Sequence, residues 1–235
     1  MGGISYDKKD AIATITFNWS ASDSGPDPAI ERELAKAVDD FGRDPACRVG
    51  ILTGTGESFC GEWTEPEPFL AEAQRGFSHF ATLYPFSNDT DKPVIAAVNG
   101  AAIGRGFELA LDCDIRIASE SATFAVGPVK NDRRLIYAAQ VLPRLIPFGQ
   151  AMRLLLSEEV ITAQQGHRIG LVTGVVPAGR LLDEARALAQ TMAQWGLPAL
   201  IATKQIGLFW RNLMLGQSYE MARALMHANH VAQGQ

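Results

Sequence analysis

Short apolar runs alternate with helically spaced apolar residues along the first three quarters of the chain. Buried strands are predicted over Ala11–Phe17, Val49–Thr53, Val94–Val98 and Ile115–Ala118, because each run is short, rich in β-branched residues and bounded by turn residues. From Pro28 onward, apolar residues recur three and four positions apart, which predicts a helix that begins there. Strands that alternate with helices in this way indicate an α/β domain with right-handed crossovers.

Helical spacing dominates the rest of the chain. A helix is predicted over Thr162–Ile169 with Thr162 as its N-cap, and longer helices over Leu181–Trp195, Leu197–Phe209 and Gln217–His230. One more is expected within the first half, over Leu70–Leu83. We therefore divide the chain into an α/β core of residues 1–176 and a helical region of residues 177–235.

Charge and cysteine usage narrow the class of protein. A net charge of −5 and a pI near 5.4, with no basic run, argue against nucleic acid or an anionic membrane as partner. The sequence shows neither a signal-peptide pattern at its N-terminus nor a run of 18 apolar residues. Three widely spaced cysteines (Cys47, Cys60 and Cys113) favour buried free thiols in a reducing cytoplasm over a disulfide or metal site. We expect a cytoplasmic protein with no bound metal.

The segment from Asn99 to Gly106 is the strongest candidate for chemistry. It is rich in glycine, follows the strand Val94–Val98 and leads into a predicted helix, Phe107–Leu111. A turn of this kind points backbone N–H groups and the positive end of a helix dipole at one spot. That spot can hold an anion or a carbonyl oxygen that becomes negative during a reaction, and Glu108 would lie beside it. The pattern also fits a tight strand-to-helix connection with a solvated glutamate in the first turn, and on spacing alone this structural interpretation is favoured.

The acidic residues after this helix have a structural interpretation. Asp112 is expected to close the helix and Asp114 to begin the next strand, Ile115–Ala118.

The whole stretch Lys92–Ala125 closely resembles the signature of the crotonase (enoyl-CoA hydratase/isomerase) superfamily. Matches at Ile51–Gly54, Ser58–Gly61, Leu171–Val172 and Val175–Pro177 extend the resemblance, which covers most of the chain. It implies a ββα-repeat spiral core, a helical C-terminal trimerisation region, and homotrimers or hexamers. It also implies a small-molecule substrate, an acyl-CoA, in which coenzyme A is part of the substrate and not a permanently bound cofactor.

The resemblance further implies which groups perform the chemistry. In that superfamily, two backbone N–H groups form an oxyanion hole for a thioester carbonyl. Carried over, these belong to Gly61, or its neighbour Glu62, and to Arg105. Glu108 matches a catalytic acid/base of the family. The Arg105 side chain departs from the family, which usually has glycine at that position, but an arginine backbone donates as well as a glycine backbone.

A second departure concerns the reaction. Hydratases of the superfamily use two glutamates, and the second should follow Phe124, where this chain has Pro128. Proline can neither accept nor donate a proton, so ordinary hydration and ordinary isomerisation both lack a carboxylate. Trp63 and Asp132, together with Glu62, are further candidates for pocket or acid/base residues.

Two other hypotheses remain open. The stretches Ile51–Cys60 and Glu120–Phe124 resemble the 6-oxocamphor hydrolase-type members, which cleave a C–C bond in a cyclic β-diketone without coenzyme A. Asp23 and Asp27 in the entry loop would repel an ADP phosphate if the loop faces the site. Those hydrolases use histidines near the site, whereas this chain has Val129 at the matching place. The third hypothesis is a catalytically silent member kept for binding or assembly.

Overall fold

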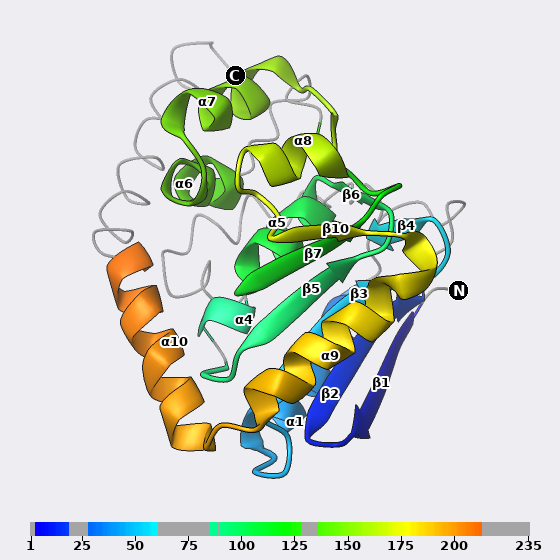
Figure 1. Cartoon of the computed structure of the whole chain (residues 1–235), viewed down its shortest axis with the longest axis vertical. Helices are drawn as coiled ribbons and strands as arrows, with labels where there is room; N and C mark the ends of the chain where they lie inside the picture. The colour runs from blue at the N-terminus through cyan, green and yellow to red at the C-terminus, as the bar shows by residue number, and fades with distance from the viewer. Residues whose placement is uncertain (1–2, 19–27, 61–84, 89, 128–135, 213–235) are drawn as a thin grey trace.

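The computed structural model describes residues 3–18, 28–60, 85–88, 90–127 and 136–212, which form two sheets and the helices around them (Figure 1). The strands are β1 (Gly3–Lys9), β2 (Ile12–Asn18), β3 (Val49–Gly54), β4 (Ser58–Cys60), β5 (Val94–Val98), β6 (Ala101–Ile103), β7 (Ile115–Ser119), β8 (Thr123–Ala125), β9 (Ile161–Thr162) and β10 (Gly174–Val176). The helices are α1 (Pro28–Arg43), α4 (Pro85–Asn88), α5 (Arg105–Asp112), α6 (Ile136–Leu145), α7 (Phe148–Ser157), α8 (Ala163–Arg168), the 3₁₀ turn η2 (Ala178–Arg180), α9 (Leu181–Ala193) and α10 (Leu197–Asn212).

The larger sheet has six strands in the order β1-β2-β3-β5-β7-β10. The β1–β2 pair is an antiparallel hairpin, and every later pair is parallel. Parallel neighbours need a crossover between them, which agrees with the alternation of strands and helices in the sequence.

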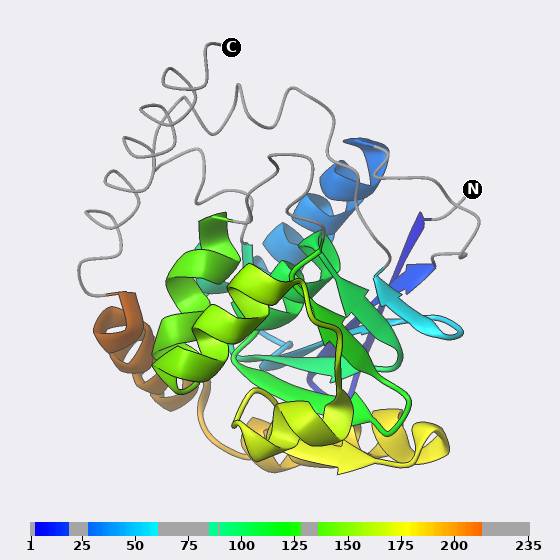
Figure 2. The same cartoon turned by 90° about the horizontal axis from the view of Figure 1, so that it is seen from above.

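Side-chain alternation along the strands gives this sheet two apolar faces. Val49 and Ile51 of β3, and Ile95 of β5, pack on one face against α9, which contributes a stripe of apolar residues (Leu181, Ala185 and Ala189). Val94, Ala96 and Val98 of β5 belong to the main core on the other face, together with residues of α1 and α5. Figure 2 shows α1 and α9 on opposite sides of the sheet. Burial on both faces explains why these strands are continuously apolar in the sequence.

The smaller sheet has the order β4-β6-β8-β9. Each of β4, β6 and β8 follows a strand of the larger sheet after a short turn, so the pairs β3/β4, β5/β6 and β7/β8 repeat one arrangement. A helix follows two of these pairs: α5 after β5/β6 and α6 after β7/β8. The fold is therefore an α/β crotonase-like spiral of ββα units, as the sequence led us to expect.

Most predicted elements are confirmed. The four predicted strands correspond to β2, β3, β5 and β7, and α1 begins at Pro28. Thr162 caps α8 through a reciprocal pair of hydrogen bonds with Gln165. The helices expected over Leu70–Leu83 and Gln217–His230 lie outside the described residues. The division of the chain at residue 176 stays a prediction.

Candidate active site

Two turns between the sheets are tied together by one side chain. The Asn99 carboxamide accepts a hydrogen bond from the Gly54 N–H at 3.0 Å and donates to the carbonyl oxygens of Gly56, at 2.9 Å, and Ser58, at 3.0 Å. The turn from β3 to β4 is thereby fixed against the turn from β5 to β6. These two turns lead to β4 and β6, and thus to the two segments that the resemblance associates with an oxyanion hole.

The helix α5 begins earlier than the sequence suggested. We expected one glycine turn over Asn99–Gly106, but the strand β6 interrupts it and the helix starts at Arg105. Gly104 precedes the helix with φ of 59°, a left-handed value that favours glycine. The Glu108 N–H makes the first intrahelical bond, to the Gly104 carbonyl at 3.1 Å. The backbone N–H groups of Arg105, Gly106 and Phe107 thus belong to the first turn, where the helix supplies them no acceptor.

Close packing places this first turn against the end of β4. A Cβ added to Gly106 would collide with the carbonyl oxygen of Cys60, the last residue of β4. Only a residue without a side chain lets the two backbones approach this closely. The end of β4 therefore lies directly against the first turn of α5, while the convergence of the Gly61 and Arg105 N–H groups stays a prediction, because Gly61 lies outside the described residues.

Glu108 is buried, with only 1% of its surface exposed. Its Oε1 accepts a hydrogen bond from the Ala138 N–H at 2.9 Å. Ala138 is the third residue of α6, so the carboxylate lies at the N-terminus of a second helix, where the helix dipole favours negative charge. The strand-to-helix connection is tight, as the alternative had it, but its expectation that Glu108 is solvated is wrong.

The Arg105 side chain is also buried, with 3% of its surface exposed. Its Nη1 lies 3.9 Å from Glu108 Oε2, so a positive charge accompanies the carboxylate on the same side of α5. Burial raises the pKa of the neighbouring Cys60 thiol to about 12, and the Arg105 charge opposes that rise only in part. Burial therefore favours the neutral form of the Cys60 thiol.

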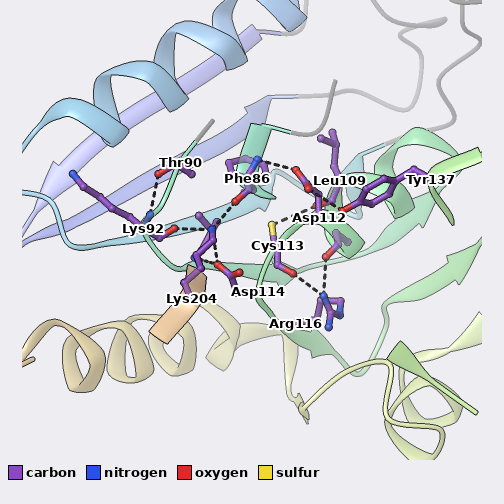
Figure 3. A network of polar contacts seen from close by, with 12 residues as sticks. Phe86, Thr90, Lys92, Leu109, Asp112, Cys113, Asp114, Arg116, Tyr137 and Lys204 are labelled. Atoms are coloured by element: carbon purple, nitrogen blue, oxygen red, sulfur yellow. Dashed lines mark hydrogen bonds and ion pairs between the residues drawn. The ribbon is translucent and has the colours of Figure 1, made fainter. Parts of the chain in front are cut away.

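Asp112 and Asp114 occupy the positions predicted for them, at the end of α5 and just before β7. Both also hold neighbouring segments (Figure 3). Asp112 accepts hydrogen bonds from the Phe86 N–H at 2.8 Å and from the Tyr137 hydroxyl at 3.0 Å. Asp114 accepts from the Val94 N–H and pairs with Lys204 of α10 at 3.0 Å.

Several candidates from the sequence lie outside the described residues: Gly61, Glu62, Trp63, Pro128 and Asp132. Within the described part of the chain, no group of three or more His, Cys, Asp or Glu side chains could hold a metal ion. All three cysteines are buried free thiols, as their spacing suggested.

Comparison with known proteins identifies the family of this chain. A family model described as enoyl-CoA hydratase/isomerase matches residues 7–208, from β1 into α10. The chain belongs to the enoyl-CoA hydratase/isomerase family. Among curated relatives, it is 35% identical to (E)-benzylidenesuccinyl-CoA hydratase of Thauera aromatica, over 90% of this chain and 84% of the relative. It is 34% identical to carnitinyl-CoA dehydratase of Proteus mirabilis, over 84% of this chain and 77% of that enzyme.

Solved structures of the enoyl-CoA hydratase/isomerase family share the fold. An enoyl-CoA hydratase from Mycobacterium tuberculosis superposes with a TM-score of 0.79 at 30% identity, covering 94% of this chain and 96% of that one. A monofunctional enoyl-CoA isomerase from M. smegmatis superposes with a TM-score of 0.76 at 28% identity, covering 92% and 97%. Membership of the crotonase superfamily is therefore confirmed.

The backbone donor to Glu108 was not found from the sequence. The Ala138 N–H, which binds the Glu108 carboxylate, is a backbone group about thirty residues downstream of it. No side-chain pattern marks such a donor, because every non-proline residue carries one.

Proposed function

We propose that this enzyme binds an acyl-CoA thioester, stabilises its enolate, and uses Glu108 to move a proton at the carbon next to the thioester carbonyl. The observation that most directly supports this proposal is the buried carboxylate of Glu108. It lies one turn into α5, the helix whose first residue is the implied oxyanion donor Arg105. A lyase or isomerase reaction fits this arrangement. The two curated relatives reported above are named as a hydratase and a dehydratase, and one solved neighbour as an isomerase.

The chemistry follows from where charge develops. When Glu108 takes a proton from the α-carbon, the C–H electron pair forms the enolate double bond, and negative charge moves onto the thioester oxygen. N–H groups of Arg105 and Gly61, together with the α5 dipole, would stabilise that oxygen; one such donor typically contributes about 10²–10³ in rate. Return of the proton from Glu108 to another carbon completes an isomerisation, and loss of a β-substituent completes an elimination.

Two departures of this sequence from the family pattern favour an alternative, a coenzyme-independent β-diketone hydrolase of the 6-oxocamphor hydrolase type. Pro128 replaces the second family glutamate, and Asp23 and Asp27 add negative charge to the entry loop. The acyl-CoA enzyme and the β-diketone hydrolase would use the same oxyanion hole. The chemical class of the ligand that binds therefore distinguishes the two hypotheses. A silent family member would bind without turnover, or would bind none of these ligands.

A thermal-shift screen tests this choice directly. The probes are coenzyme A, crotonyl-CoA, (E)-benzylidenesuccinyl-CoA, carnitinyl-CoA and a cyclic β-diketone. A ligand at 100 times its Kd adds about 2.7 kcal/mol to the free energy of unfolding, which is readily seen. We expect stabilisation by at least one thioester. Stabilisation by the diketone alone would establish the hydrolase alternative, and no shift with any probe would favour the silent member.

Hydration of crotonyl-CoA is expected to be very weak or absent. Pro128 removes one of two carboxylates that share the proton transfers, a role worth about 10²–10⁴ in rate. The measurement is the loss of enoyl-thioester absorbance on addition of enzyme. Rapid turnover would show that another group, for which Glu62 and Asp132 are the sequence candidates, has replaced the missing glutamate.

Replacement of Glu108 tests the catalytic assignment. Glu108→Gln keeps the size of the side chain and an oxygen for the Ala138 N–H, but it cannot transfer a proton. We expect kcat on the thioester that turns over to fall about 10²-fold or more, with little change in Tm. Glu120→Gln, an exposed glutamate after β7, is the matched control. A Glu108→Gln enzyme with near-normal kcat would move the chemistry to another residue.

We also propose a cytoplasmic homotrimer or hexamer. Large apolar side chains of the C-terminal region are exposed in the single chain: Trp195 by 65%, Ile206 by 73% and Phe209 by 74%. Exposed apolar groups that lie near one another commonly mark an interaction surface. The three free thiols suit a reducing compartment. Among the helices in the described part of the chain, none is long and apolar enough to cross a membrane.

A further inference from the structure

Two carboxylates of α5 hold the first turn of α6 at adjacent residues. Glu108 and Asp112 are one helical turn apart, so they project from the same side of α5, and both are buried. Glu108 accepts from the Ala138 N–H, while Asp112 accepts from the hydroxyl of the preceding residue, Tyr137. The Tyr137–Asp112 bond therefore lies directly beside the contact that holds the proposed catalytic carboxylate.

Asp112 is itself fixed from a third element. Its Oδ2 accepts from the Phe86 N–H of α4 at 2.8 Å, and the Phe86 carbonyl accepts from Lys204 Nζ of α10 at 2.5 Å. Figure 3 shows the Asp112 carboxylate between Phe86 and Tyr137, with Lys204 on the far side of Phe86. The Asp112 carboxylate thus has little freedom to move, and it can serve as a fixed point for α6.

Because Asp112 is buried, its hydrogen bond to Tyr137 constrains the position of α6. A buried carboxylate is costly unless hydrogen bonds compensate it, so Asp112 strongly favours the geometry in which its donors stay in place. The Tyr137–Asp112 hydrogen bond thereby sets the distance between α5 and the first turn of α6. Because Ala138 follows Tyr137 in the chain, the same bond also fixes the position of the Ala138 N–H. A small displacement of that turn would lengthen the Ala138–Glu108 hydrogen bond and release Glu108 Oε1.

We propose that Asp112 and Tyr137 form a positioning pair for Glu108, in which the Tyr137–Asp112 hydrogen bond keeps the Ala138 N–H on the Glu108 carboxylate. The inference rests on the proposed catalytic role of Glu108. Neither residue needs to touch substrate. They act through Glu108 by fixing the orientation of its carboxylate, and misplacement of a catalytic group by about 1 Å can cost about 10²-fold in rate.

The first test needs no substrate. Tyr137→Phe removes one oxygen atom and keeps the ring, so it breaks the bond to Asp112 with little change in packing. We expect hydrogen–deuterium exchange of the Ala138 amide, followed by NMR, to accelerate about tenfold or more. The matched control is Tyr6→Phe, because the Tyr6 hydroxyl makes a similar 2.8 Å bond to Asp40 between β1 and α1. That variant should leave Ala138 exchange unchanged.

The second test is kinetic, with (E)-benzylidenesuccinyl-CoA as the probe. Tyr137→Phe should lower kcat about 10- to 100-fold with KM nearly unchanged, while Tyr6→Phe changes neither. In a Glu108→Gln background, Tyr137→Phe should cost less than about twofold further, because a residue that acts through Glu108 has nothing left to position. Asp112→Asn in the parent enzyme should keep most activity, since an amide can accept from Phe86 and donate to the Tyr137 oxygen.

These outcomes separate the two proposals. An unchanged Ala138 exchange rate in Tyr137→Phe, or an equal loss of kcat with and without Glu108, would overturn the positioning pair. Activity retained in Glu108→Gln alone would overturn the catalytic assignment, whereas the exchange result would still decide whether the pair holds Ala138. If Tyr137→Phe fails to fold, the double variant Tyr137→Phe/Asp112→Asn removes the uncompensated charge, and the same exchange increase and loss of kcat are expected.

Discussion

Each oxygen of the Glu108 carboxylate has its own electrostatic neighbour: Ala138 N–H on Oε1, and the Arg105 guanidinium 3.9 Å from Oε2. Both favour the negative form, which is the form a general base needs. Glu108 and Arg105 could be identified as site candidates from the sequence, because both belong to a motif of fixed spacing. Their burial and the Ala138 donor could not be identified in this way, since these depend on how α6 packs on α5.

Arg105→Gln is expected to move the acidic limb of the kcat–pH profile to higher pH. The Arg105 guanidinium lies 3.9 Å from the Glu108 carboxylate and favours its negative form, so without that charge the carboxylate should need a higher pH to lose its proton. Other titratable groups packed around this end of α5 (Asp112, Tyr137 of α6 and Cys60 of β4) remain unchanged in the variant.

The measurement for this variant is kcat across pH on the thioester that turns over. Arg43→Gln is the control, because Arg43 pairs with Asp39 at 2.7 Å on the exposed side of α1. A limb that stays in place in Arg105→Gln, or that shifts equally in both variants, would mean that Arg105 does not set the charge of Glu108.

At the scale of elements, the start of α5 shows what a sequence pattern conceals. Glycines at positions 104 and 106 predicted a turn that continued to Phe107, since glycine is a poor helix former. In the structure, Gly104 is in the turn and Gly106 is helical, and position 106 needs a glycine because the end of β4 leaves no room for a side chain. The three-residue strands β4, β6 and β8 were missed for a related reason: so short a run carries no recognisable alternation.

Gly106→Ala should damage both stability and catalysis. The added methyl group would collide with the Cys60 carbonyl oxygen, which separates the end of β4 from the first turn of α5. We expect a loss of about 1–3 kcal/mol in the free energy of unfolding, as is typical of overpacking, and a lower kcat because the proposed oxyanion donors diverge. Denaturant unfolding and steady-state kinetics measure the two effects.

Gly149→Ala provides the comparison for that variant. Gly149 also lies in the first turn of a helix, α7, but nothing is within 4 Å of the Cβ it would gain. There the substitution should be neutral or slightly stabilising, because alanine favours a helix. Equal effects of the two substitutions would show that helix propensity, and not contact with Cys60, governs position 106.

At the scale of the whole molecule, α9 and α10 differ in how they contact the core. The apolar face of α9 is buried on the large sheet, and this amphipathic pattern made the helix predictable from sequence. From α10, Leu200 packs against the apolar cluster under α9, and one buried lysine, Lys204, binds two carbonyl oxygens and Asp114 (Figure 3). Sequence reasoning did not identify Lys204, because a lysine on a helix is usually exposed.

The apolar side chains on the exposed side of α10 lead to the last prediction, which is that the protein is a trimer or a dimer of trimers. Ile206 and Phe209 lie three residues apart, on one side of the helix, and both are more than 70% exposed. We expect sedimentation velocity at micromolar concentration to show a trimer or hexamer. We expect the double variant Ile206→Asp/Phe209→Asp to dissociate, because an interface core does not tolerate buried unpaired carboxylates.

The control for that variant is Ala187→Asp/Gln190→Asp, which introduces the same two charges at exposed positions of α9 that are also three residues apart. Its sedimentation should match that of the parent protein, which separates loss of the apolar contact from added negative charge. A parent protein that sediments as a monomer would refute assembly altogether. A double variant that stays oligomeric would place the interface on another surface, for which the exposed Phe148 and Leu156 of α7 are the next apolar side chains to replace.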